Sequence, residues 1–140
     1  MNANSITLTL LDGRSATRLG PLASLVAQDA SGQFGILPGH IALVTVLEPG
    51  IFRFRMGGAT AWSYGACAGG LLYCQDHSEG TQVQIVSRRF LLGEVPEELQ
   101  DLLEGMLASE HSLRMSTRDS LAQLEQAFYK RVQALGQQAP

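Results

Sequence analysis

The sequence contains little cysteine, little charge and no long apolar run, and each shortage excludes a class of protein. Among its 140 residues, 16% are charged and two are cysteines, Cys67 and Cys74. Their spacing matches neither a CxxC redox pair nor a metal knuckle, so we interpret both as small buried hydrophobic side chains. Apolar residues make up 45% of the chain, but glycine, proline or charge interrupts every run. We therefore expect no membrane-spanning helix.

The charges and histidines exclude two further kinds of site. The chain has 10 basic and 13 acidic side chains and a net charge of −3, whereas nucleic-acid binding normally needs a clustered basic face. His40, His77 and His111 lie far apart and form no HxxxH or HExxH pattern, so no metal site is predicted. The N-terminal residues MNANSITLTLLDG lack the basic and apolar regions of a signal peptide, so we expect a cytoplasmic location.

Residues 1–87 carry the pattern of an antiparallel β domain. Polar and apolar residues alternate before Asp12-Gly13, a dipeptide that favours a hairpin turn. Further turn signals occur at Glu48-Pro49-Gly50, Met56-Gly57-Gly58 and Ser78-Glu79-Gly80. This spacing predicts a β-sandwich or flattened barrel. The expected strands cover residues 6–10, 22–27, 42–47, 51–55, 60–64, 71–74 and 82–86.

Residues 88–140 change to a helical pattern, in which apolar residues fall three and four apart. Pro96 with its acidic neighbours favours the start of a first helix, and a second helix is expected from Ser116 or Thr117. Neither helix could bury its apolar face alone, so we predict an antiparallel two-helix hairpin with a turn at 110–115. The apolar stripe of this hairpin is expected either to pack on the β domain or to lie on another protein. The apolar faces consist of Leu99, Leu102, Leu103 and Met106, and of Leu121, Leu124, Phe128 and Val132.

The segment GQFGILPGHIALVTVLEPG, residues 32–50, places glycine and proline around an apolar run. Gly32, Gly35 and Gly39 permit positive φ or close backbone approach, and Pro38 fixes φ, so the segment predicts a stiff loop. A stiff and mostly uncharged loop suits protein recognition, because little entropy is lost on binding.

Three roles are open for His40: a hydrogen bond to backbone within the loop, contact with a partner, or catalysis together with Asp29 or Asp76. The chain has no GxSxG elbow or other recognisable nucleophile context. We therefore predict a non-catalytic protein, and the backbone role for His40 is favoured over partner contact.

Residues 32–40, followed by Leu43-Val44-Thr45 and Leu47-Glu48-Pro49-Gly50, resemble the signature of the epsilon subunit of F-type ATP synthases. The order of parts is similar too, with a Gly69-Gly70 pair late in the β domain and a helical tail. The resemblance implies a non-catalytic central-stalk subunit without a cofactor, which couples gamma rotation to the membrane c-ring for ion-driven ATP synthesis. It also implies a peripheral position on the cytoplasmic side of an energy-transducing membrane.

The same resemblance implies roles for individual parts of the chain. One apolar side of the sandwich would pack on the gamma subunit. The tail would reach the alpha and beta catalytic subunits and regulate ATP hydrolysis. Gly35, Pro38 and Gly39 would shape the loop, and the residues facing the c-ring would be Ser31, Gly32, Gln33, Phe34 and His40.

Two features depart from the pattern of the family. Residues 94–110 contain six acids and no lysine or arginine, whereas many relatives have basic helices there, and the arginine-bearing ATP motif of some relatives is missing. Gln33 stands where relatives often carry an acid directed at the ring. Both features suggest a divergent branch that serves an alternative rotary ATPase driven by Na⁺ or H⁺. The alternative is a β-sandwich binding module of another cytoplasmic assembly.

Overall fold

The computed structural model describes residues 4–137, which divide into two compact units after Glu104. Unit 1 contains the strands and the beginning of the helix, and unit 2 consists of the rest of the helix. In chain order the elements are β1 (Ile6–Leu11), β2 (Ala16–Asp29), β3 (Gly32–Ile36), β4 (Leu43–Met56), β5 (Ser63–His77), β6 (Gly80–Val86), β7 (Phe90–Gly93) and α1 (Pro96–Gln137).

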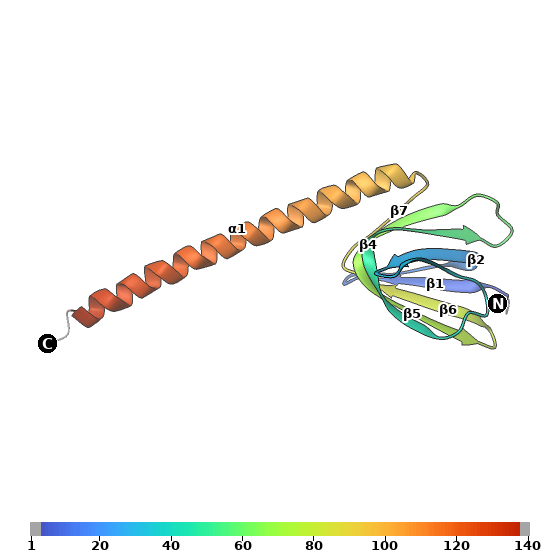
Figure 1. The fold of residues 1–140 in the computed structure, drawn as a ribbon, viewed down its shortest axis with the longest axis horizontal. Coiled ribbons are helices and arrows are strands. Elements are labelled where there is room, and N and C mark those ends of the chain that lie inside the picture. The colour runs from blue at the N-terminus through green and yellow to red at the C-terminus, as the bar shows by residue number, and fades with distance from the viewer. Residues whose placement is uncertain (1–3, 138–140) are drawn as a thin grey trace. The chain divides into compact units, whose positions relative to one another are not determined.

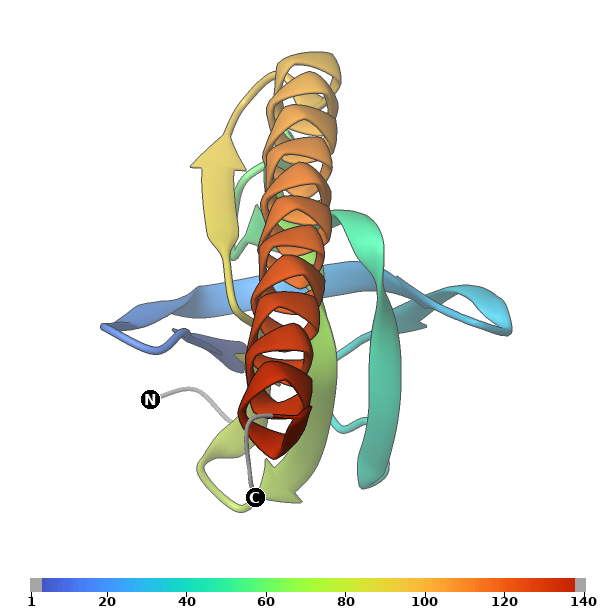
Figure 2. The same ribbon diagram turned by 90° about the vertical axis from the view of Figure 1, so that its left-hand side faces the viewer.

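The strands of unit 1 form one sheet that closes into a flattened barrel (Figure 1). The strand order is β1-β6-β5-β4-β2-β3, and an additional β1–β2 pairing closes the ring. Strand β1 is parallel to β6 and antiparallel to β2. Strand β7, the short yellow arrow in Figure 2, pairs with β5 outside this ring. The predicted β-barrel architecture is therefore confirmed.

Alternating apolar side chains fill the interior of the barrel. In β1 every second residue from Ile6 to Leu10 is buried, as the period of two requires. Cys67 and Cys74 are buried free thiols, as the sequence predicts. Further buried members of the core are Leu22, Leu25, Ile36, Leu47, Leu72, Val83 and Ile85.

Aromatic packing closes one part of the interior. The Phe52 ring lies against Gly65, where an added Cβ would come within 2.2 Å of the ring. Phe90 of β7 meets the same ring edge-on, with 6.4 Å between the ring centroids. Because Phe90 lies beyond residue 87, the strand that carries it extends the β structure past the predicted start of the helical tail.

The predicted turn at Glu48-Pro49-Gly50 is wrong, since these residues lie inside β4. Proline is normally excluded from the middle of a sheet because it cannot donate to the ladder. Here the β2–β4 pairing is irregular between the Val26–Arg53 and Asp29–Leu47 pairs. Pro49 therefore lies where the neighbouring strand leaves a gap in the ladder.

Two other strand predictions also need correction. Residues 32–36, predicted as part of a stiff loop, form strand β3, which is antiparallel to β2. Residues 60–62 precede β5, which continues without interruption from Ser63 to His77. The loop that remains of the predicted stiff segment covers residues 37–42.

Strands β4 and β5 reverse their inside–outside alternation halfway along. Val44 and Val46 are exposed, whereas Phe52 and Phe54, also even-numbered, are buried. In the paired strand Gly69 has a φ of +83°, a conformation that glycine adopts without steric cost. Each strand therefore presents two different outward surfaces, one on either side of the reversal.

The predicted two-helix hairpin is wrong, because α1 is one unbroken helix (Figure 1). Residues 110–115 contain neither glycine nor proline, so nothing in them breaks a helix. Ser116, predicted as a cap, lies inside the helix. A single helix keeps one apolar face in phase. It carries Leu103, Met106, Leu113, Leu121 and Leu124, interrupted at the same spacing by Glu110 and Thr117. The predicted first turn at Pro96 is confirmed.

We expect Gly70→Ala to destabilise the protein strongly. A Cβ at Gly70 would lie 1.9 Å from the Val86 carbonyl oxygen, and the φ of +152° is also unfavourable for alanine. Overpacking and backbone strain each cost roughly 1–3 kcal/mol. Urea unfolding should show a loss of at least about 2 kcal/mol.

Gly13→Ala is the matched control, because no atom lies within 4 Å of the added Cβ. Its unfolding midpoint should stay near that of the parent chain. Equal stability of the two variants would contradict the close approach at Gly70.

Candidate protein-interaction surfaces

The loop at 37–42 is held by a hydrogen bond within it and by another to the β5–β6 hairpin. The His40 amide donates to the Leu37 carbonyl at 3.1 Å and closes a turn in which Gly39 has a φ of +87°. The Gly39 amide donates to Thr81 Oγ1 at 2.7 Å, and this buried hydroxyl donates to Asp76 at 2.9 Å. The loop therefore has a defined shape held by a buried threonine.

The hydrogen bonds of His40 are made with backbone. Besides its amide bond, the ring Nδ1 lies 2.7 Å from the Ile41 carbonyl oxygen. Asp76 accepts from Thr81, and Asp29 accepts from Ser31 and Thr45. The described contacts thus match the backbone role and give no arrangement of nucleophile, base and orienting acid.

Asp29 ties the β2–β3 turn to β4. Its carboxylate accepts hydrogen bonds from the Ser31 amide at 2.9 Å, from the Ser31 hydroxyl and from Thr45 Oγ1 at 2.7 Å. The hydroxyl bonds from Ser31 and then Thr45 lower the pKa of Asp29 below its usual value, because they stabilise the charged form. This turn carries the first of the predicted ring-contact residues.

The predicted ring-contact residues differ in what they expose. Ser31 lies in the β2–β3 turn, and Gly32 begins β3. Gln33 is exposed, whereas Phe34 packs against the core. The half-buried His40 belongs to the separate loop. Gly35 is exposed in β3, so the segment presents mainly Ser31, Gln33 and open backbone to a partner.

An apolar patch on β4, β5 and β6 was missed by the sequence analysis. Val44 pairs with Tyr73, Val46 with Leu71, and Leu71 with Val86, so five side chains adjoin across three strands. Their exposed fractions run from 36% for Tyr73 to 68% for Val46. The signal in the sequence is the run Leu43–Leu47, which has apolar residues at both even and odd positions. We call these five residues the apolar patch.

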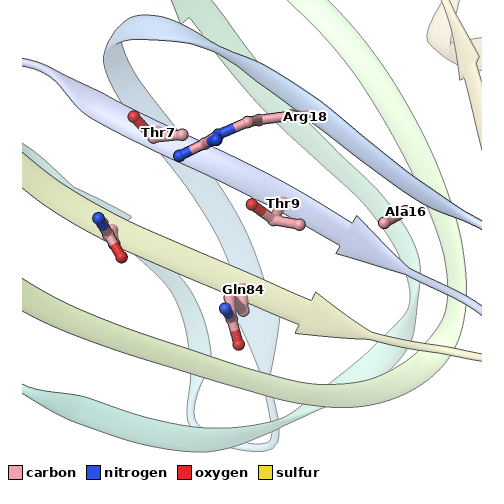
Figure 3. Close-up of a pocket in the computed structure, with 6 residues that line it drawn as sticks. Thr7, Thr9, Ala16, Arg18 and Gln84 are labelled. Carbon is pink, nitrogen blue, oxygen red and sulfur yellow. The ribbon is translucent and has the colours of Figure 1, made fainter. Parts of the chain in front are cut away.

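The outward face continues from the apolar patch into a polar depression on β1, β2 and β6 (Figure 3). Gln84 pairs with Tyr73 of the patch. The Arg18 side chain extends across β1 toward Thr7. The depression has a volume of about 360 Å³ and is lined by Thr7, Thr9, Ala16, Arg18, Gln82 and Gln84.

A cationic cluster lies on the other outward surface of β4. The guanidinium carbons of Arg53 and Arg55 lie 4.5 and 5.4 Å from the ring centroid of Trp62, within the range of cation–π attraction. The buried Nε of Arg55 has no hydrogen-bond partner within the described residues. Alternate residues of β4 place the two arginines on one side, a juxtaposition that the sequence analysis did not identify.

The two parts of α1 differ in exposure. Leu99 and Leu103 are buried within unit 1, and Leu102 is exposed on the same helix. Among the described residues of unit 2, Met106 is partly buried. The remaining predicted face residues, Leu121, Leu124, Phe128 and Val132, are exposed.

Neither a metal centre nor a membrane span is found in the part of the chain that the structure describes. Residues 4–137 contain no group of three or more metal-ligating His, Cys, Asp or Glu side chains. None of the helical sequence described there is apolar over enough of its length to cross a bilayer.

Comparison with known proteins identifies the family. Residues 8–92 match the family model described as "ATP synthase, Delta/Epsilon chain, beta-sandwich domain", which covers the barrel from β1 into β7. The chain belongs to this delta/epsilon family. The resemblance seen in residues 32–50 is thereby confirmed.

Curated relatives and a solved structure agree with the family. "ATP synthase epsilon chain 2" of Cereibacter sphaeroides is 44% identical over 73 residues, 52% of this chain and 47% of the relative. The match to that relative thus spans about half of its length. "ATP synthase epsilon chain" of Prochlorococcus marinus (strain AS9601) is 32% identical over 107 residues, 74% and 75% of the two chains.

The solved structure is a chain of the Euglena gracilis mitochondrial ATP synthase, in a structure titled OSCP/F1/c-ring. It aligns with a TM-score of 0.57 and 25% identity over 75% of this chain and 65% of its own. Its likeness extends the family assignment from sequence to fold.

In this delta/epsilon chain, Thr45→Val should raise the pKa of Asp29, because it removes one hydrogen bond to the carboxylate. The pKa of Asp29 is lower in the folded chain than in the unfolded chain, so the ionised carboxylate stabilises the fold above the unfolded pKa of about 3.9. This stabilisation is lost as the pH falls through the folded pKa. A carboxyl NMR titration should show the rise.

Asp12 provides the internal control for this titration. Its pKa is lowered chiefly by hydrogen bonds from the Arg14 and Ser15 amides, which Thr45 does not touch. An Asp29 titration that stays unchanged in Thr45→Val would contradict the role of the threonine.

Proposed function

We propose that this chain is an epsilon-type subunit of the central stalk of an F-type ATP synthase, peripheral to the membrane and without catalytic activity. It couples rotation of the gamma subunit to the c-ring. The observation that carries the proposal is the family match over residues 8–92, which coincides with the closed barrel. The resemblance of residues 32–50 supports it independently of the helical tail.

The apolar patch is the surface that suits the gamma subunit. Its five side chains adjoin across β4, β5 and β6 and are at least one-third exposed. Contiguous exposed apolar surface marks interaction sites, and a rotating interface needs a water-excluding core rather than a few exposed ion pairs, which contribute little. The polar depression beside it would supply the hydrogen-bonding rim.

The ring-contact role belongs to the β2–β3 turn and the loop at 37–42. Ser31 and Gln33 present polar groups, and hydrogen bonds accepted by Asp29 and Thr81 hold the two segments in shape. Preshaped segments lose little entropy on binding. His40 would act through the loop backbone, to which its ring is bonded.

The chain would serve a second, divergent ATP synthase. Two similar proteins, from Cereibacter sphaeroides and Paraburkholderia xenovorans, are named "ATP synthase epsilon chain 2". The glutamine at position 33 and the six acids of residues 94–110 support the same placement. The coupling ion, Na⁺ or H⁺, would be selected by the ring rather than by this subunit.

Val46→Asp should abolish stable association with gamma. The carboxylate would be buried without a partner in the apolar patch, and losses at such positions commonly exceed about 2 kcal/mol, or roughly 30-fold in affinity. Co-purification of gamma with the tagged full-length chain from its native cells measures the effect.

Leu92→Asp is the matched control, because Leu92 is an exposed apolar residue of β7 outside the apolar patch. This variant should still co-purify gamma. If the parent chain retrieved neither gamma nor the catalytic subunits, the stalk assignment would be wrong. If Leu92→Asp alone lost gamma, the gamma-binding surface would include β7 rather than the apolar patch.

We also propose that unit 2 regulates ATP hydrolysis through contacts with the alpha and beta subunits. Its exposed apolar side chains and its bases Arg114, Arg118, Lys130 and Arg131 are the features suited to such contacts. A chain ending at Glu104 keeps Leu99 and Leu103, which are buried in unit 1. The complex with this shortened chain should assemble normally and hydrolyse ATP faster. An unchanged rate would remove the regulatory role.

A further inference from the structure

A small depression connects the predicted ring-contact segment with the cationic cluster. It has a volume of about 170 Å³ and is lined by Val26, Ala27, Gln33, Ile51, Arg53 and Tyr64. The strand register explains the arrangement, because Arg53 of β4 pairs with Val26 on one side and with Tyr64 on the other. Gly35, which pairs with Val26, carries no side chain to cover it.

The polar groups of this depression are donors without an acid among them. Arg53 offers only N–H donors, while the Gln33 amide and the Tyr64 hydroxyl can each donate as well. A carboxylate accepts hydrogen bonds on both oxygens and binds guanidinium groups in a bidentate geometry. The lining therefore matches an Asp or Glu side chain better than a cation or an apolar group.

The cationic charge beside the depression is uncompensated within the described residues. Both Arg53 and Arg55 stack on Trp62, and neither forms an ion pair with a carboxylate in that part of the chain. Two like charges on one indole repel each other, so an added negative charge is favourable at this place. The cluster thus provides the electrostatic attraction, and the depression provides the geometry.

The size of the depression limits what can occupy it. Small-molecule sites usually measure roughly 300–1,000 Å³, and 170 Å³ is below that range. One side chain of a partner protein fits this space, whereas a nucleotide does not.

We propose that the depression binds the carboxylate of an Asp or Glu side chain from the partner polypeptide that docks on the β2–β3 turn. Gln33 and Arg53 bind the carboxylate, the Trp62 ring holds Arg53 in place, and Arg55 adds positive charge beside it. This proposal rests on the stalk function above, because the docking partner of the β2–β3 turn is the c-ring. A glutamine at position 33 is then favourable, since an acid there would repel the incoming carboxylate.

A protein carboxylate fits the observations better than an anionic lipid. Lipid recognition normally uses clusters of four to eight basic residues, whereas this cluster has two arginines on a chain with a net charge of −3. The depression is also continuous with Gln33 of the predicted docking segment. The surface therefore favours a single contact between an arginine and a protein carboxylate.

Gln33→Glu and Arg53→Gln test the proposal in the full-length chain. The measurement is the affinity of the labelled chain for ATP synthase purified from the same cells and stripped of this subunit. Each variant should bind roughly tenfold more weakly at low salt, with a smaller difference at high salt, because both changes act on a partly screened charge pair. Circular dichroism checks that each variant is folded.

Thr17→Glu and Arg14→Ala are the matched controls, since both residues are exposed and neither lines the depression. They should bind as the parent chain does. Unchanged affinity in Gln33→Glu or Arg53→Gln would overturn the proposal, and tighter binding by Gln33→Glu would show that the occupant is a cation.

Two further outcomes would also decide the matter. Vesicles containing phosphatidylglycerol test the lipid alternative: weaker vesicle binding by Arg53→Gln, with unchanged binding to the stripped complex, would overturn the proposal in favour of a lipid. If the parent chain did not bind the stripped complex, the stalk function itself would be overturned. If the parent chain bound and the variants bound equally well, only the carboxylate proposal would fail.

Discussion

The barrel depends on one close backbone approach, between Gly70 of β5 and the Val86 carbonyl of β6. A methyl group at Gly70 would lie 1.9 Å from that oxygen, so no residue with a side chain fits there. The preceding Gly69 has a φ of +83°, and the two glycines together let β5 and its neighbour β4 exchange their inward and outward sides. A backbone contact thus decides which side chains reach the surface.

This exchange produces two surfaces of different chemistry from the same pair of strands. One half of β4 and β5 presents the apolar patch, and the other presents arginines around Trp62. An apolar surface contributes affinity by excluding water, while a paired charge fixes orientation and excludes wrong partners. A subunit that turns with a shaft needs both, because it must neither detach nor slip.

Local sequence patterns predict most of unit 1, and the errors have identifiable physical causes. The alternation in Ile6–Leu10 and the turn at Asp12-Gly13 need no information from distant residues. Pro49 was assigned to a turn because no local signal reveals that β2 leaves a gap in the ladder beside it. The apolar patch was not predictable, since the run Leu43–Leu47 is apolar on both sides and alternation cannot say which side faces the core.

The helical tail could not be decided by spacing, because one helix and two helices share the same apolar periodicity. The absence of glycine and proline from residues 110–115 agrees with the unbroken α1. At 1.5 Å per residue, positions 105–137 extend about 50 Å in one piece. Folded back at residue 112, the longer arm, residues 113–137, would extend about 38 Å. Forming or losing a single turn would therefore change by about a quarter the distance that this segment spans.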